Sequence, residues 1–107
     1  MKESKVVEKV KKLFKSVFKK PDINKIHVSP IHNRGFPDLL IVTEFGAFFI
    51  EVKAPGKNLT LLQKTKLLEI KKAGGESVYC YLATCDSVGN LLFKNPETEE
   101  IVCEVKC

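Results

Sequence analysis

The first part of the chain places an apolar residue at every third or fourth position. These residues are Val6, Val7, Val10, Leu13, Phe14, Val17 and Phe18, and lysines occupy most of the positions between them. This spacing predicts an amphipathic helix over about residues 3–19, which Pro21 ends. The lysine-rich face suits a phosphate backbone, although a charged helix face is more often only the solvated side.

The next apolar runs follow the pattern of strands. Residues 23–28 alternate apolar and polar side chains, residues 29–37 contain two prolines and a glycine, and residues 39–42 and 47–52 are apolar. We expect a short strand, a loop and then a β-hairpin.

The turn of this hairpin decides which face its charged residues share. If Phe45-Gly46 is a two-residue turn, Asp38 lies opposite Lys53 and Leu40 opposite Glu51. The three charged side chains then point to one face. A three-residue turn would place Asp38 on the other side of the sheet.

A second helix is predicted after the hairpin. Thr60 and Gln63 fit the first and last positions of a capping box. The helix continues through Leu67 and Ile70 and ends at the glycine pair of residues 74–75.

Three further strands are expected, over residues 77–84, 90–94 and 101–105, the last two as a terminal hairpin. A strand, helix, strand order implies a right-handed crossover and a mixed sheet. The predicted fold class is therefore α/β, with a mixed β-sheet flanked by helices in α-β-β-β-α-β order. With 107 residues, we expect a single domain over residues 1–107.

The net charge of +5 changes this picture by suggesting a polyanionic partner. Of the 18 lysine and arginine residues, only Arg34 is an arginine. Lysines provide point charges and not the forked donors that read bases, so contact with DNA phosphates without base recognition is favoured. The alternative is a lysine-rich surface that serves only solubility.

The four cysteines do not suggest a metal cluster. Cys80, Cys85, Cys103 and Cys107 include no C-x-x-C pair. No apolar run approaches 18 residues and no signal-peptide pattern is present, so we expect no membrane association and a cytoplasmic location, or the host-cell cytoplasm for a viral protein. Cys80 is expected in the core, and a disulfide between the two cysteine regions remains open for a hyperthermophilic source.

Asp38, Glu51 and Lys53 are the candidate chemical centre. Charged side chains in the most hydrophobic strand of the chain need compensation, which a divalent cation provides. A Mg²⁺ ion held by Asp38, Glu51 and the carbonyl of Val52 would activate water for phosphodiester hydrolysis, and Lys53 would orient or deprotonate that water or stabilise the transition state. The alternative is a buried ion pair without catalysis.

Gln63 and two glutamates extend this candidate site. Gln63 falls on the inward stripe of its helix, where it either only caps the helix or also supports Glu51 and Lys53. Glu3 and Glu8 lie on the first predicted helix, and either could act as a further metal ligand, directly or through water.

Several residues near the candidate site are expected to contact DNA. Arg34, Lys57 and Lys66 are the candidate phosphate contacts, and Gly35 allows close approach of the backbone. His32-Asn33 suggests an HNH-type nuclease, but a loop histidine is favoured because no second histidine or zinc ligand follows.

Taken together, these segments resemble the PD-(D/E)XK nuclease superfamily and, within it, the VRR-NUC group. The resemblance rests on Gly35-Phe36-Pro37-Asp38-Leu39, on Ile50-Glu51-Val52-Lys53-Ala54-Pro55, on Leu59-Thr60 ahead of Gln63, and on Gly74 ahead of a strand at Val78. It covers about residues 35–82. The helix that begins Lys2-Glu3-Ser4 resembles the opening glutamate helix of the family.

This resemblance implies a restriction-endonuclease-like core and a Mg²⁺- or Mn²⁺-dependent nuclease. Asp38 and Glu51 would be metal ligands, Lys53 the catalytic lysine and Gln63 a supporting residue. The helix glutamate of the family corresponds best to Glu3.

The resemblance also implies a substrate and an assembly. The chain is similar in size to stand-alone members of virus or phage type. By this resemblance it would form a homodimer that cuts branched DNA, such as four-way (Holliday) junctions or flaps. Two alternatives remain open, namely a non-catalytic DNA-binding or dimeric interaction protein on the same scaffold, and an archaeal-type Holliday junction resolvase.

Overall fold

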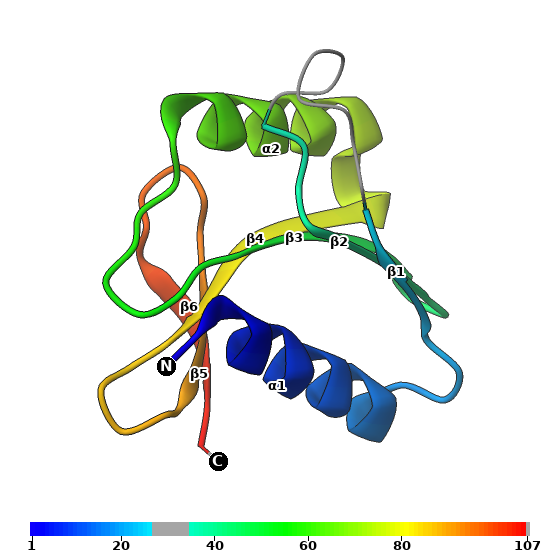
Figure 1. Ribbon diagram of the computed structural model, residues 1–107. Coiled ribbons are helices and arrows are strands. Elements are labelled where there is room, and N and C mark those ends of the chain that lie inside the picture. The colour runs from blue at the N-terminus through cyan, green and yellow to red at the C-terminus, as the bar shows by residue number, and fades with distance from the viewer. Residues whose placement is uncertain (27–34, 107) are drawn as a thin grey trace.

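A six-stranded sheet with one helix on each face forms the frame of the protein (Figure 1). The computed structural model describes residues 1–26 and 35–106. The elements are α1 (Glu3–Val17), β1 (Asp22–Lys25), β2 (Leu39–Thr43), β3 (Gly46–Val52), α2 (Leu61–Gly74), a 3₁₀ turn η1 (Gly75–Ser77), β4 (Val78–Cys85), β5 (Leu91–Lys94) and β6 (Ile101–Val105). The predicted α/β class and the order of its elements are confirmed, with a restriction-endonuclease-like core.

The strands lie side by side in the order in which they occur along the chain. All neighbours are antiparallel except β3 and β4, which are parallel. Parallel neighbours need a long crossover, which α2 provides. The sheet is therefore mixed, as predicted, and its terminal hairpin β5–β6 is also confirmed.

The apolar core lies between α1 and the sheet. Val6, Val10 and Phe14 are buried on the inner face of α1, as the helical spacing predicts. They pack against buried residues of four strands, which are Leu39, Ile41, Ile50, Val52, Ala83, Cys85, Leu91 and Phe93. The helix ends two residues earlier than predicted, because Phe18 already has extended backbone angles. Neither helix of the described residues is long and apolar enough to cross a membrane.

The turn between β2 and β3 has two residues, as predicted, but it lies one residue earlier in the chain than predicted. Its two turn residues are Glu44 and Phe45, since Thr43 pairs with Gly46. The Thr43 hydroxyl closes the turn one residue early, because it accepts a hydrogen bond from the Phe45 N–H at 3.1 Å. It also lies 3.1 Å from the Gly46 carbonyl, to which it donates.

The strand partners predicted for this hairpin were therefore wrong by two residues. Leu40 lies opposite Phe49 and not opposite Glu51. Because Leu39 lies opposite Ile50, the next position brings Asp38 opposite Glu51, and not opposite Lys53. A shift of two residues preserves the face on which each side chain lies, so the shared face of the charged residues is retained.

The second helix begins with the predicted capping box. The Thr60 hydroxyl accepts from the Gln63 N–H at 3.2 Å, and the Thr60 N–H donates to Gln63 Oε1 at 3.0 Å. The helix ends at Gly74, and Gly75 follows with a φ of 62°. Leu67 is fully buried, which fixes the face of α2 that packs against the sheet.

The described cysteines differ in their exposure. Cys80 and Cys85 are buried and Cys103 is exposed. The expectation that Cys80 belongs to the core is confirmed, and burial raises its pKa to about 11. His27, His32, Arg34 and Cys107 lie outside the described residues.

Two glycines allow a test of how the loop before β2 docks on α2. Gly35 and Gly56 have φ values of 80° and 81°, but a Cβ atom on Gly35 would lie 2.5 Å from the Leu62 carbonyl oxygen, whereas one on Gly56 would meet nothing within 4 Å. We expect Gly56→Ala to cost about 1 kcal/mol of unfolding free energy. Gly35→Ala should cost roughly 2–4 kcal/mol, because backbone must move as well. Urea denaturation of both variants measures the difference, and equal losses would contradict the close approach.

Candidate functional site

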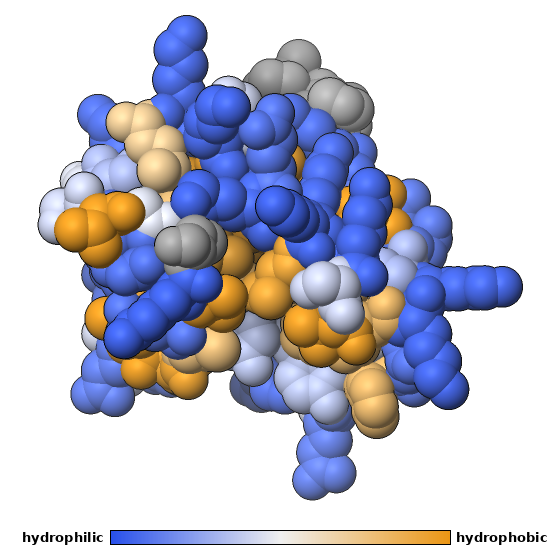
Figure 2. Space-filling view, turned by 90° about the horizontal axis from the view of Figure 1, so that it is seen from below, coloured by the Kyte–Doolittle hydropathy of each residue, from blue (hydrophilic) through white to orange (hydrophobic). Residues whose placement is uncertain are grey.

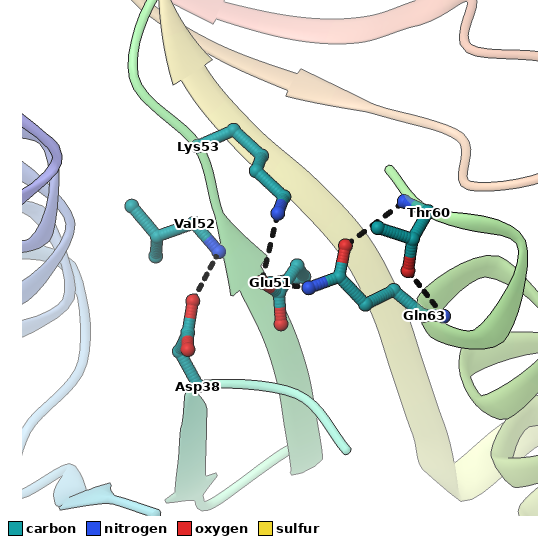
Figure 3. Close-up of polar contacts among 6 residues, drawn as sticks. All are labelled: Asp38, Glu51, Val52, Lys53, Thr60 and Gln63. Atoms are coloured by element: carbon teal, nitrogen blue, oxygen red, sulfur yellow. Dashed lines mark hydrogen bonds and ion pairs between the residues drawn. The ribbon is translucent and has the colours of Figure 1, made fainter. Parts of the chain in front are cut away.

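Asp38 is held at the end of β3 by backbone hydrogen bonds (Figure 3). Its Oδ2 accepts from the Val52 N–H at 3.0 Å. Its own carbonyl accepts from the Ile26 N–H at 2.7 Å, which ties it to the chain after β1. The carboxylate is therefore fixed in position although it precedes the first residue of β2.

Glu51 is the buried charge of the site, with only 2% of its surface exposed. Its Oε2 accepts from Gln63 Nε2 at 3.1 Å and lies 3.7 Å from the Lys53 ammonium nitrogen. Its Oε1 is buried without a hydrogen-bond partner among the described residues. A buried carboxylate oxygen in this state is costly unless it binds a further group.

Gln63 makes both of the contacts that the sequence offered as alternatives. Its backbone N–H and its Oε1 complete the capping box with Thr60. Its Nε2 reaches Glu51 from the same position (Figure 3). The start of α2 is thus joined directly to the buried carboxylate of β3.

Glu3 completes a cluster of three carboxylates. Glu3, Asp38 and Glu51 each present an oxygen, and these oxygens all lie within 4.8 Å of one another. Glu8 instead forms a surface ion pair with Lys5 at 3.5 Å. Of the two helix acids considered, Glu3 therefore joins Asp38 and Glu51, and Glu8 does not.

The electrostatics of the cluster favour a neutral Glu51 when no cation is bound. Burial, followed by the charge of Asp38, raises the pKa of Glu51 from 4.5 to about 8, and Glu3 acts in the same direction. Lys53 lowers this pKa but does not offset the other effects. Three acids at this separation resist simultaneous ionisation unless positive charge is supplied.

The residues fit a hard divalent metal ion. Carboxylate oxygens are the ligands that these hard cations prefer, and the unpartnered Oε1 of Glu51 is a ligand atom in need of a partner. A cation bound here would supply a Lewis acid and a more acidic water. Lys53, 18% exposed at its side chain, would place a positive charge beside the same carboxylate.

The residues predicted to contact DNA have different surroundings. Arg34 lies outside the described residues. Gly35 packs closely on the first turn of α2, so the lack of a side chain at this position allows this packing. Lys57 is exposed in the loop after β3. Lys66 lies 5.9 Å from the centre of the Phe36 ring and 3.9 Å from Glu69, so it is partly engaged within the protein.

One buried polar residue near the site was not singled out from the sequence. Thr84 is 5% exposed, and its hydroxyl has no hydrogen-bond partner among the described residues. Because Val52 pairs with Ala83 in parallel register, the next positions bring Thr84 beside Lys53 on one face. A threonine inside an apolar strand is common, so the sequence contained no signal for this placement.

The raised pKa of Glu51 leads to a prediction about stability without metal. Because the folded chain holds this proton up to about pH 8 and the unfolded chain releases it near 4.5, wild-type stability falls as pH rises between these values. Glu51→Gln carries no such proton, so in chelator it should be more stable than wild type by roughly 5 kcal/mol at about pH 9 and equal to it near pH 4. Denaturant unfolding at each pH measures this difference.

The control for this prediction is Glu8→Gln, which removes an exposed carboxylate of α1. Its stability should follow that of wild type across the whole pH range. A constant difference between Glu51→Gln and wild type at all pH values would contradict the assignment of the titrating group.

Comparison with known proteins agrees with this geometry. The VRR-NUC domain matches residues 6–83, which include α1 from Val6 onward, the β2–β3 hairpin, α2 and most of β4, whereas Glu3 precedes the matched residues. No match was found among proteins of curated function. VRR-NUC is a nuclease-type domain, and the match covers more than half of the chain, so this protein belongs to the VRR-NUC family.

Proposed function

We propose that the protein is a metal-dependent endonuclease that hydrolyses phosphodiester bonds in DNA. The observation that carries this proposal is the convergence of Glu3, Asp38 and Glu51 within 4.8 Å, with the Lys53 ammonium 3.7 Å from Glu51. Hydrolysis of a phosphodiester requires an activated water and neutralisation of charge on the phosphorus oxygens, and acids that hold a cation beside a lysine can meet both needs.

Asp38 and Glu51 are the proposed main ligands of Mg²⁺ or Mn²⁺. The carbonyl of Val52 follows Glu51 directly, and Glu3 reaches the same point from α1 as a direct or water-linked ligand. The hydrogen bond from the Val52 N–H to Oδ2 keeps the Asp38 carboxylate oriented. Four oxygen ligands, from α1, from β3 and from the residue before β2, would leave room for water and a phosphate oxygen.

Lys53 is the proposed catalytic lysine. It lies on the same face of β3 as Glu51 and is mostly shielded from solvent, so its charge is weakly screened. From this position it can orient a water molecule or stabilise the negative charge that develops on the phosphate. Gln63 is a positioning residue, because it contacts Glu51 and holds one of its oxygens in place.

DNA contacts are proposed for Arg34, Gly35, Lys57 and Lys66, which flank the site along the chain. Lys57 is exposed and free to meet a phosphate, and the net charge of +5 favours a polyanion. Lys66 would exchange its contacts with Glu69 and Phe36 for a phosphate. The proposed substrate is branched DNA, such as a four-way junction or a flap, cut by a homodimer in which residues 1–107 form a single domain.

Cleavage assays on linear, flapped and four-way DNA test this function. With Mg²⁺ or Mn²⁺, wild type should cut branched substrates faster than linear ones, and chelator should abolish cutting. Asp38→Asn, Glu51→Gln and Lys53→Met should each lose at least about 100-fold in rate, because each removes a ligand or a charge needed in the transition state.

The matched control for Lys53→Met is Lys25→Met, which removes an exposed lysine of β1. This variant should fold and cut like wild type. Full activity in Glu51→Gln would refute the proposed mechanism, whereas DNA binding without cutting by wild type would favour a non-catalytic role.

The double role of Gln63 can be separated by two substitutions. Thr60→Ala breaks the capping box but leaves the Gln63 amide free to contact Glu51, so it should cost about 1 kcal/mol of stability with activity retained. Gln63→Ala removes both contacts and should also lower the cleavage rate by roughly 10- to 100-fold. Equal activity losses in the two variants would show that Gln63 acts only through the helix cap.

A further inference from the structure

The two faces of the sheet differ in how their polar groups are satisfied. The face toward α1 carries the apolar core and, between α1 and β6, an apolar groove of about 390 Å³. The walls of this groove include Leu13, Val17 and Phe18 of α1 and Val102, Cys103 and Val105 of β6. Figure 2 looks onto this side of the molecule, where hydrophobic side chains gather between projecting hydrophilic ones.

The face toward α2 instead contains buried polar atoms that lack a partner. Among the described residues, two buried side-chain oxygens accept and donate no hydrogen bond, and they are Glu51 Oε1 and Thr84 Oγ1. Glu51 is a proposed metal ligand, which accounts for its free oxygen. Nothing in the proposed site accounts for the hydroxyl of Thr84.

Strand register places Thr84 beside Lys53. Val52 pairs with Ala83, and both lie in the core under α1. The ladder continues one step further, because the Lys53 N–H donates to the Ala83 carbonyl at 2.9 Å. Side chains alternate along a strand, so Lys53 and Thr84 both lie on the opposite face, toward α2. The partner of Thr84 on its other side is the apolar Leu92 of β5, so Lys53 is the register neighbour that carries hydrogen-bond donors.

The hydroxyl of Thr84 is costly in this position. The residue is 5% exposed, and Leu82 and Leu92 on the same face are apolar and buried. A buried hydroxyl without a partner destabilises a protein relative to an apolar group of the same shape. Valine has that shape and is favoured in strands, so packing by itself does not require a threonine here. The hydroxyl is therefore expected to gain its partner in another state of the protein.

The ammonium group of Lys53 is attracted to Glu51 by charge and not held by a hydrogen bond (Figure 3). Its nitrogen lies 3.7 Å from Glu51 Oε2, which is too long for a hydrogen bond. An ammonium has three donors on a flexible stem, so it can exchange one acceptor for another. When Glu51 binds a cation, its carboxylate no longer attracts the ammonium, and Lys53 then needs another acceptor.

Thr84 lies on the side of Lys53 that faces away from Asp38. The strand order places β3 between β2 and β4, so Asp38, directly before β2, and Thr84 of β4 are on opposite sides of β3. A hydroxyl oxygen can accept a hydrogen bond from an ammonium without neutralising its charge. A lysine held in this way keeps its full positive charge for a phosphate group.

We propose that the Thr84 hydroxyl accepts a hydrogen bond from the Lys53 ammonium and holds it in position for the reaction once Glu51 has bound a cation. Thr84 is then a positioning residue, which acts through Lys53 and does not touch the substrate. It lies one residue beyond residues 6–83, so the match to the VRR-NUC domain does not include it. The inference rests on the proposed nuclease function for its role in catalysis, whereas the hydrogen bond itself can be tested without DNA.

Urea denaturation of Thr84→Val and Thr84→Ser tests this hydrogen bond. In chelator, Thr84→Val should unfold at a higher urea concentration than wild type, because valine replaces a hydroxyl that has no partner. Added Mn²⁺ should raise the midpoints of wild type and Thr84→Ser more than that of Thr84→Val, because only a hydroxyl can accept from Lys53. In a Lys53→Met background, Mn²⁺ should shift the midpoint equally with and without Thr84→Val.

Cleavage kinetics test the positioning role. With Mn²⁺, Thr84→Val should lower kcat about 10-fold with KM unchanged, whereas Thr84→Ser should stay within about 2-fold of wild type. Adding Thr84→Val to Lys53→Met should cause no further loss, because the hydroxyl acts through the lysine. The matched control is Thr65→Val, since Thr65 is exposed on α2. It should match wild type in its response to Mn²⁺ and in its kinetics.

Equal Mn²⁺-induced shifts in wild type and Thr84→Val would overturn the proposal, as would a lower midpoint of Thr84→Val in chelator. Undiminished cleavage by Thr84→Val would overturn it as well and leave the nuclease function intact. A further loss in the double variant would show that Thr84 does not act through Lys53. If wild type cuts no DNA while the Mn²⁺-induced shifts differ as expected, the nuclease function is refuted and the hydrogen bond is supported.

Discussion

Antiparallel pairing of β2 with β3 is the constraint on which the site depends. With Leu39 opposite Ile50, Asp38 reaches the end of β3 and accepts the Val52 N–H at 3.0 Å. A slip of one residue would turn Leu39 and Ile41, both fully buried, away from the α1 core. The apolar residues that hold the hairpin in register therefore also hold the carboxylates in place.

The site itself works against the stability of the frame that positions it. Glu51 is buried beside two other acids, and one of its oxygens has no hydrogen-bond partner among the described residues. Lys53 and Gln63 offset part of this cost through the other oxygen. A cluster with too little positive charge and too few hydrogen-bond donors is suited to binding a cation, because the cation supplies the positive charge that the surrounding residues do not provide.

The two faces of the sheet carry different features, the clustered charged residues on one and the apolar core on the other. The side chains of Glu51 and Lys53 lie on the face toward α2, where the capping box brings Gln63 to Glu51. The other face carries the core and, beyond the cover of α1, the apolar groove. Because the groove includes β6, the terminal hairpin extends the apolar face of the sheet without altering the strands that carry the acids.

Most elements of the fold could be predicted because their signals are local. The three-to-four spacing of apolar residues located α1, Thr60 and Gln63 located the start of α2, and the strand patterns located the terminal hairpin within one residue. The position of the first hairpin turn was wrong, because the side chain of Thr43 closes the turn early and this choice is not visible in hydrophobic periodicity.

The sequence by itself determined which residue types are available for chemistry, and that Asp38, Glu51 and Lys53 share a face if the hairpin turn has two residues, as it does in the structure. Only the tertiary structure decided that Glu3 and not Glu8 joins Asp38 and Glu51, because this depends on how α1 packs across the sheet. The structure also decided that Gln63 serves both the cap and the site, that Thr84 lies beside Lys53 and that α1 and β6 share a groove. These relations join residues far apart in the chain, and long-range packing, unlike helix or strand pattern, leaves no local trace in the sequence.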